Sequence, residues 1–74
     1  MPRLPRVSGR KAAGALEKAG FETVRTRGDH ARMCNPVTGR RTVVSLTSDI
    51  LPVGTLASIL RQAGLTAEEF RELL

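Results

Sequence analysis

The chain has no tryptophan and no tyrosine, and only two phenylalanines, one histidine and one cysteine among its 74 residues. With so few aromatic residues, valine, leucine, isoleucine and alanine must form a core, and at this length the core is small. The single Cys34 has no partner for an internal disulfide, which is typical of the reducing cytoplasm, and the sequence predicts that location. One histidine and one cysteine are too few for a closed zinc site, and no glycine-rich phosphate loop occurs. We therefore expect neither a metal nor a cofactor.

Long hydrophobic runs are also absent. Residues 1–7 carry two prolines and two arginines, and no apolar stretch follows them. The sequence thus predicts neither a secretory signal nor a membrane-spanning segment. We expect residues 1–7 to be a flexible basic lead and residues 8–74 to form one domain. Hydrophobic residues make up 41% of the chain, which argues against a disordered protein.

Acidic residues are the minority. There are 12 lysines and arginines against 7 aspartates and glutamates, so the net charge is +5. Most of the cations lie within residues 1–41 and most are arginines, whose planar donors suit phosphate. Glu68, Glu69 and Glu72 make the C-terminal end more acidic. This balance favours an acidic partner such as nucleic acid, with a solvated basic surface as the alternative.

Helix signals occupy the two ends of the chain and strand signals the middle. Ser8 is suited to cap the first helix, and Gly20 and Gly64 stand where two helices are expected to end. Thr66 and Glu69 form the pattern of a capping box for a short last helix. The sequence predicts these elements in order: a helix over 9–19, strands over 21–27, 30–34 and 41–46, a helix over 52–63 and a short helix from 67.

This order predicts an α+β fold, in which three short strands form an antiparallel sheet and the two main helices cover one face. Alternate residues of a strand point to opposite faces. If Met33 packs against the helices, His30 and Arg32 lie together on the open face, which avoids the cost of burying an arginine. The apolar stripe of the second helix, expected in the core, comprises Val53, Leu56, Ile59, Leu60 and Ala63.

The single histidine lies in the basic run 27–32, and this makes His30 the candidate catalytic residue. In RNA cleavage the substrate's own 2′-hydroxyl is the nucleophile, so the protein must supply a proton acceptor, positive charge and alignment. An imidazole exchanges protons near neutral pH, and arginines neutralise charge that develops on the phosphate. Residue type alone favours a simpler interpretation, in which the ring only hydrogen-bonds the turn at Gly28 and Asp29.

The absence of a second histidine leaves water, water polarised by an arginine, or His30 itself acting in turn as the general acid, which predicts a slow nuclease. Position and, for the arginines, charge select the residues that we expect to contact RNA. They are Arg25, Arg27, Gly28, Arg32, Arg40 and Arg41.

From Ser8 onward the chain resembles the HicA family, small RNA-cleaving toxins of type II toxin–antitoxin systems. The run Gly28-Asp29-His30 is weak evidence alone, but its order with the other segments is specific. The segments that carry the resemblance are 16–21, 28–30, 35–36, 42–44, 54–56, 59–65 and 69–70.

The resemblance implies a fold like that of double-stranded-RNA-binding domains and metal-independent cleavage of mRNA by a histidine, which maps onto His30. It also implies neutralisation by a HicB-type antitoxin in a hetero-oligomer. The chain departs from many relatives in having Ser45 and Thr47 where they carry a proline and a second histidine, and some have a histidine at the position of Ala31. The alternative function is therefore a non-catalytic RNA-binding module or a degenerate toxin that binds RNA or antitoxin without cleavage.

Overall fold

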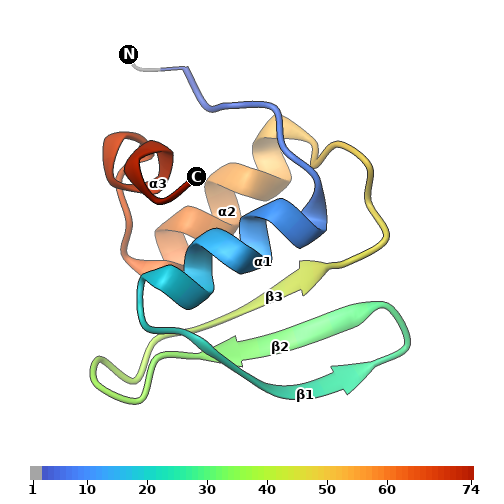
Figure 1. Cartoon of the computed structure of the whole chain (residues 1–74), viewed down its shortest axis with the longest axis vertical. Helices are drawn as coiled ribbons and strands as arrows, with labels where there is room; N and C mark the ends of the chain where they lie inside the picture. Colours follow the sequence, from blue (N-terminus) through green and yellow to red (C-terminus); the bar gives the residue numbers. More distant parts are fainter. Residues whose placement is uncertain (1–2) are drawn as a thin grey trace.

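The computed structural model describes residues 3–74, which form a layer of helices on a three-stranded antiparallel sheet (Figure 1). The order of elements along the chain confirms the predicted α+β fold, and the strands follow one another in the sheet as they do in the sequence. The elements are α1 (Gly9–Lys18), β1 (Glu22–Arg27), β2 (His30–Cys34), β3 (Arg41–Ser45), α2 (Val53–Ala63) and α3 (Ala67–Leu73).

The ends of the helices are set by local hydrogen bonds. The Ser8 side chain accepts from the amide of Lys11 at the start of α1. Thr66 and Glu69 form both bonds of the predicted capping box at the start of α3. Gly64 ends α2 with a φ of 75°, in the left-handed region that glycine adopts without strain. These contacts confirm the predicted starts and stops to within a residue.

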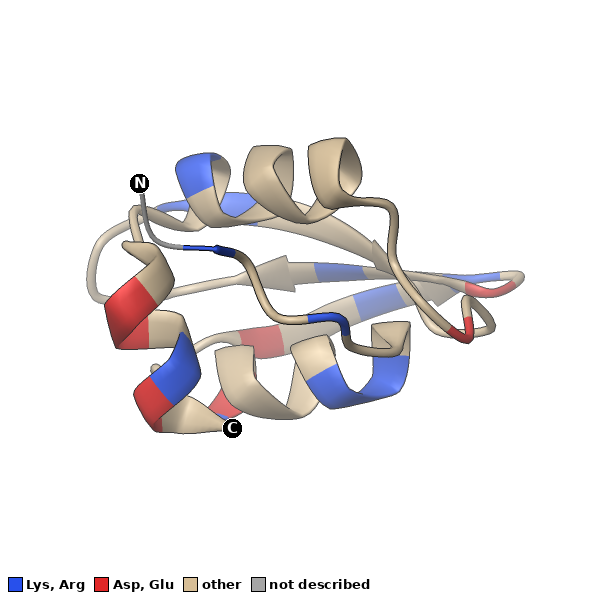
Figure 2. Cartoon of the chain, turned by 90° about the horizontal axis from the view of Figure 1, so that it is seen from above, with Lys and Arg blue, Asp and Glu red and all other residues tan. Residues whose placement is uncertain are grey.

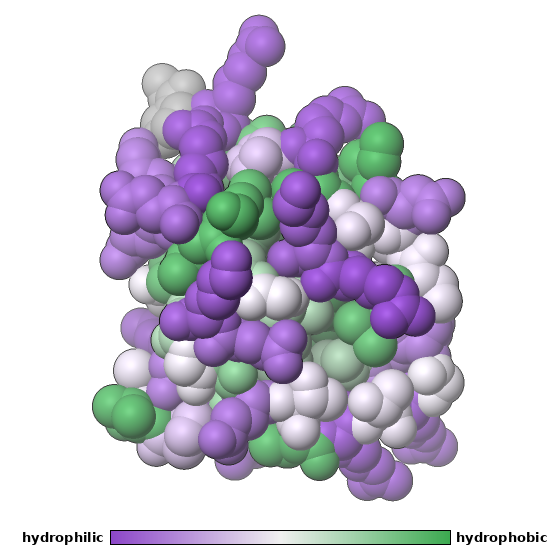
Figure 3. All heavy atoms as spheres, viewed as in Figure 1, coloured by the Kyte–Doolittle hydropathy of each residue, from purple (hydrophilic) through white to green (hydrophobic). Residues whose placement is uncertain are grey.

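The core lies between the helices and the inner face of the sheet, and every layer contributes to it. The largest fully buried side chains are Leu16, Met33, Val44, Leu56 and Phe70. In the space-filling view of Figure 3, apolar side chains appear as separate small patches among hydrophilic ones.

One residue of the predicted apolar stripe is not in the core. Val53 is 56% exposed because it is the first residue of α2 and lies at the end of the helix, away from the residues of that helix that are buried. The rest of the stripe is buried as predicted.

Residues 3–7 reach the core before α1 begins. Leu4 packs against the buried residues, Val7 is itself buried, and the Val7 carbonyl accepts from the amide of Leu51 at 2.8 Å. The Arg71 side chain donates to the carbonyl of Arg3. Of the predicted lead at 1–7, residues 1–2 lie outside the described residues, and the flexibility of that lead stays a prediction. None of the helices described is long and apolar enough to cross a bilayer.

The sheet extends beyond the helices that cover it. All residues of β1 are exposed, whereas exposed and buried residues alternate along β2 and β3. In Figure 1, β3 lies nearest to the helices and β1 farthest from them. Seen from above, the strands and α1 carry cations and α3 carries most of its charge as carboxylates (Figure 2). The uneven charge expected from the sequence is thus seen as several cations on the strands and α1 and a majority of carboxylates in α3.

The turn between β2 and β3 is built on the buried Asn35. Its Oδ1 accepts from the amides of Val37 at 2.9 Å and Thr38 at 3.3 Å, and its Nδ2 donates to the carbonyl of Ala19 at 3.4 Å. Its amide and carbonyl also bond across the turn to Arg40 and Gly39. Asn35 thus joins this hairpin to the end of α1 and holds the pairing of the two strands.

Candidate functional site

The outer face of the sheet, which the helices leave open, carries the candidate catalytic residue and most of the candidate RNA-binding residues. Residues directly opposite one another in an antiparallel sheet lie on the same face. The alternation in β2 buries Ala31 and Met33 and exposes His30 and Arg32, as predicted. The rungs of the outer face, read across β1, β2 and β3, are Arg27–His30–Ser45, Arg25–Arg32–Val43 and Glu22–Cys34–Arg41.

Two hollows that share Arg32 and Val43 meet at this face and form what we call the outer groove. The smaller is lined by Arg27, His30, Arg32 and Val43. Arg32 and Val43 also line the larger, so the groove is continuous from His30 towards Arg41. In β1 a bulge lies between Thr23 and Arg25, and Val24, the residue in the bulge, lines the larger hollow. The larger hollow is also lined by Arg25, Cys34 and Arg41. Met33, Thr42 and Gln62 complete its lining, so it reaches beyond the outer face to buried residues of the sheet and to α2.

The arginines of the outer groove form no ion pair among the described residues. Arg25 and Arg32 are direct cross-strand partners, and like charges in such positions repel one another. Within residues 3–74 the one ion pair joins His30 to Asp29, so no carboxylate pairs with these arginines. An anion in the groove would relieve the repulsion, and phosphate has the geometry to accept from two guanidinium groups.

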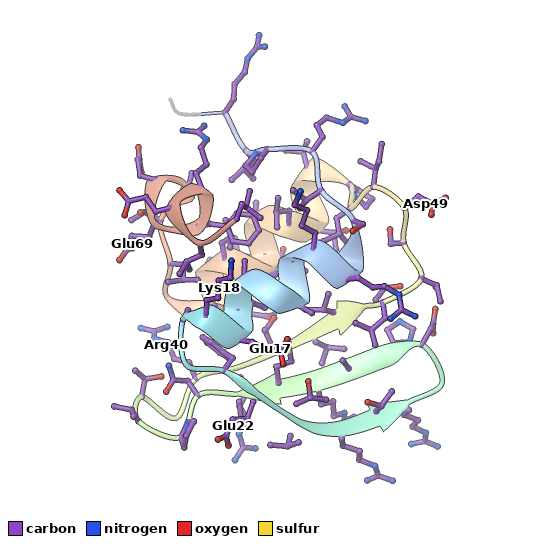
Figure 4. The ribbon with its side chains drawn as sticks, viewed as in Figure 1. Glu17, Lys18, Glu22, Arg40, Asp49 and Glu69 are labelled. Carbon is purple, nitrogen blue, oxygen red and sulfur yellow. The ribbon has the colours of Figure 1, made fainter. Side chains whose placement is uncertain are left out.

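Two of the predicted RNA-binding residues differ from the others. Gly28 lies in the β1–β2 turn with a φ of 61°, where it offers only its backbone to a ligand. The Arg40 side chain lies over Gly64 at the C-terminal end of α2, where a cation is favoured by the helix dipole. Figure 4 shows Arg40 near the end of α1, across the molecule from the β1–β2 turn. The structure thus groups His30 with Arg25, Arg27, Arg32 and Arg41, and leaves Arg40 outside the groove.

The imidazole contacts the β1–β2 turn, as the simpler interpretation of His30 expected, and the group that it contacts is the Asp29 carboxylate. Asp29 Oδ1 lies 2.9 Å from Nδ1 of His30, and Asp29 Oδ2 accepts from the hydroxyl of Thr47 at 2.7 Å. The Asp29 carbonyl also accepts from the amide of Leu46 at 2.7 Å. These bonds connect the β1–β2 turn to the segment that follows β3.

The hydrogen bond from Thr47 is the main reason why the pKa of Asp29 lies below its ordinary value of 3.8, helped by a backbone hydrogen bond and by the nearby His30. Asp29 is therefore ionised at neutral pH. The position of Asp29 beside the only histidine was a signal that the sequence offered. Thr47 is 18 residues from Asp29, and no local pattern connects these two residues.

The residues described contain no group of three or more histidine, cysteine, aspartate or glutamate side chains placed to hold a metal ion. The chemistry that the outer groove can offer with its own side chains is proton transfer by an imidazole next to a positively charged surface.

Comparison with protein families identifies a family for this chain. The model of the family described as the HicA toxin of bacterial toxin–antitoxin systems matches residues 9–65. That match runs from the start of α1 to just beyond α2 and includes the whole outer groove. Comparison with curated proteins gives no match. Since the family model covers most of the chain, the protein belongs to the HicA toxin family, the toxin components of bacterial toxin–antitoxin systems.

Proposed function

We propose that this HicA-family toxin is an endoribonuclease that cleaves mRNA in the cytoplasm, that His30 is its catalytic residue, and that a HicB-type antitoxin inhibits it. The observation that carries the proposal is the exposed His30 at one end of the outer groove, in the same hollow as Arg27 and Arg32. Family membership adds that the chain is a toxin with an antitoxin partner.

The proposed reaction uses the side chains that line this hollow, together with water and the 2′-hydroxyl of the RNA. His30 accepts the proton of the RNA 2′-hydroxyl, and the 2′-oxygen forms a bond to the adjacent phosphorus. The bond between phosphorus and the 5′-oxygen breaks, and the leaving oxygen takes a proton from water or from the protonated His30. Arg27 and Arg32 neutralise the charge that develops on the phosphate oxygens. The products are a 2′,3′-cyclic phosphate and a 5′-hydroxyl.

The length of the outer groove suits a single RNA strand that continues past the cleaved bond. Successive rungs of the outer face are about 7 Å apart, comparable to the spacing of phosphates along one strand. Arg32 lies one rung from His30 and Arg41 lies two rungs away. Val24 and Val43 offer apolar surface between the arginines for sugars or bases. We propose that RNA runs from His30 towards Arg41.

Incubation of the purified chain with single-stranded RNA between about pH 6 and 8, where imidazole changes its protonation, tests this function. With a chelator present and the antitoxin absent, we expect products that end in a 2′,3′-cyclic phosphate and a 5′-hydroxyl. The same RNA methylated at every 2′-oxygen should bind and stay intact. Intact unmodified RNA under all these conditions would contradict the nuclease and support the alternative, binding without cleavage, which the lack of a second histidine favours.

Replacement of Arg25, Arg32 or Arg41 by alanine, one at a time, is expected to lower the affinity for RNA. Each replacement should also make that affinity depend less steeply on salt concentration. Each lost phosphate contact should reduce the slope of log affinity against log salt by about 0.7 for a single strand. Titrations by fluorescence anisotropy at several salt concentrations measure both quantities. Lys18→Ala removes an equal charge from α1, outside the groove, and should leave the slope unchanged (Figure 4). Equal slopes for all four variants would place the RNA elsewhere.

The proposed antitoxin should cover the outer groove. Its exposed arginines favour acidic or aromatic groups on the partner. A complex in which His30 stays fully accessible would contradict inhibition by masking of the groove.

A further inference from the structure

We propose that Asp29, held in place by Thr47, is a positioning residue that fixes the ring of His30 in one orientation and one tautomer, so that Nε2 is the nitrogen that accepts the proton. The effect on rate rests on the proposed function. The positioning itself is a property of the folded chain and can be measured without RNA.

The geometry assigns different tasks to the two oxygens of one carboxylate. Oδ1 of Asp29 lies 2.9 Å from Nδ1 of His30, and Oδ2 accepts from the hydroxyl of Thr47 at 2.7 Å. A neutral imidazole has one N–H donor and one acceptor nitrogen, and the partner of one nitrogen decides which is which. A carboxylate accepts but does not donate, so its contact with Nδ1 selects the form with the proton on Nδ1. Nε2 then carries the free lone pair.

Thr47 matters because the site is open to water. The side chains of His30 and Asp29 are 59% and 41% exposed, and an exposed pair of this kind is weak when both partners are free to move. Here the carboxylate is fixed on its other side by Thr47, and its backbone carbonyl is bonded to the amide of Leu46. Only the imidazole remains to be ordered. The segment after β3 therefore holds the β1–β2 turn in the conformation that orients His30.

The charge of Asp29 is constant in the pH range where an imidazole works. Its pKa is lowered from 3.8, first by the Thr47 hydroxyl. A lowered pKa in the folded protein means that the interaction is fully present above the unfolded value and is lost only as the pH falls through the folded value. Between about pH 6 and 8 the carboxylate is therefore ionised in nearly every molecule.

The first measurement is the tautomer of His30 in free, ¹⁵N-labelled protein. Long-range ¹H–¹⁵N correlation spectra of the ring, recorded where the imidazole is neutral, should show a protonated Nδ1 and an unprotonated Nε2 in the wild type. Asp29→Ala should shift the population towards the form with the proton on Nε2. Thr47→Val, which keeps the shape but removes the hydroxyl, should shift it in the same direction, and Thr47→Ser should restore it. Thr55→Val, at an exposed site on α2, is the matched control.

The second measurement is the rate of RNA cleavage by the same variants. Because Asp29 orients the proton acceptor and does not contact the RNA, Asp29→Ala should lower kcat by about 10- to 100-fold, the worth of a hydrogen bond to a charged group, and change KM little. Thr47→Val should give a smaller loss of kcat that Thr47→Ser reverses. All variants should keep the wild-type circular dichroism spectrum, because exposed pairs contribute little to folding.

The outcomes separate this inference from the proposed function. An unchanged tautomer in Asp29→Ala overturns the positioning role, whatever the RNA does. A shifted tautomer in a chain whose wild type cuts no RNA supports the positioning and overturns the nuclease. A shifted tautomer with wild-type kcat in Asp29→Ala overturns the claim that the orientation of the ring matters for cleavage.

Discussion

Replacement of His30 by alanine is expected to abolish the growth arrest and the loss of full-length mRNA that the wild type should cause in bacteria lacking the antitoxin. His30 is the only imidazole in the chain, so no other side chain of this kind can take over the transfer of the proton. Loss of a general acid–base group costs about 100- to 10,000-fold in rate. Growth curves and gel analysis of total mRNA after induction measure the two effects.

The same variant should keep its fold and its affinity for RNA. The His30 side chain is 59% exposed, so its removal leaves no cavity, and the four arginines of the outer groove are retained. We therefore expect a loss in kcat with little change in RNA binding. Equal cleavage of RNA by the wild type and by His30→Ala would point to another site or to a contaminant. If both are harmless although folded, RNA binding without cleavage becomes the leading account.

Replacement of Gly9 by alanine is expected to destabilise the fold, whereas the same replacement at Gly14, the other glycine of α1, is not. A Cβ at this position would overlap the carbonyl oxygen of Ser45 and lie 2.7 Å from its carbonyl carbon. Both atoms belong to the backbone, so no rotamer change relieves the overlap, and α1 must move away from the end of β3. The Gly9 amide would also lose its bond of 2.9 Å to the carbonyl of Ser48.

Overpacking of a core costs about 1–3 kcal/mol, and an overlap with a fixed backbone belongs at or above the upper end of that range. Each kcal/mol lowers the melting temperature of a domain this small by about 4–8 °C. Thermal and urea denaturation measure the loss.

Gly14→Ala is the matched control, because the position lies in the same helix and has nothing within 4 Å of an added Cβ. It should raise stability by about 0.5–1 kcal/mol through helix propensity. Equal stabilities of the two variants would show that α1 does not approach β3 as described.

The boundaries of the elements could be predicted because the interactions that set them are local. The caps at Ser8 and Thr66 bond to residues three positions away, and the φ of Gly64 is a property of that residue alone. The period of two in β2 is likewise local, and it placed His30 and Arg32 together on the outer face. The sequence did not predict that β1 extends past the helices and is exposed throughout. The exposure of β1 depends on the width of the helix layer, which is set by tertiary packing.

The arginines show where charge and position are insufficient. Arg40 and Arg41 are neighbours in the sequence and were predicted to have the same role. Arg41 begins β3 and faces the outer groove opposite Cys34, whereas Arg40 precedes the strand and lies over Gly64. The difference is decided by the residue at which the strand begins and by the position of α2, and neither is encoded in the charge of the side chain.

The sequence by itself determined the order and type of the elements, the family, the basic character of one face and the choice of His30 as the candidate catalytic residue. These follow from caps, periodicity and residue type, which act over a few positions. Only the tertiary structure decided which arginines share a groove with His30, why Gly9 must be glycine, and that Thr47 holds Asp29 against the imidazole. Those facts depend on contacts between segments far apart in the chain, and such contacts exist only once the helices have packed on the sheet and fixed the distances between its turns.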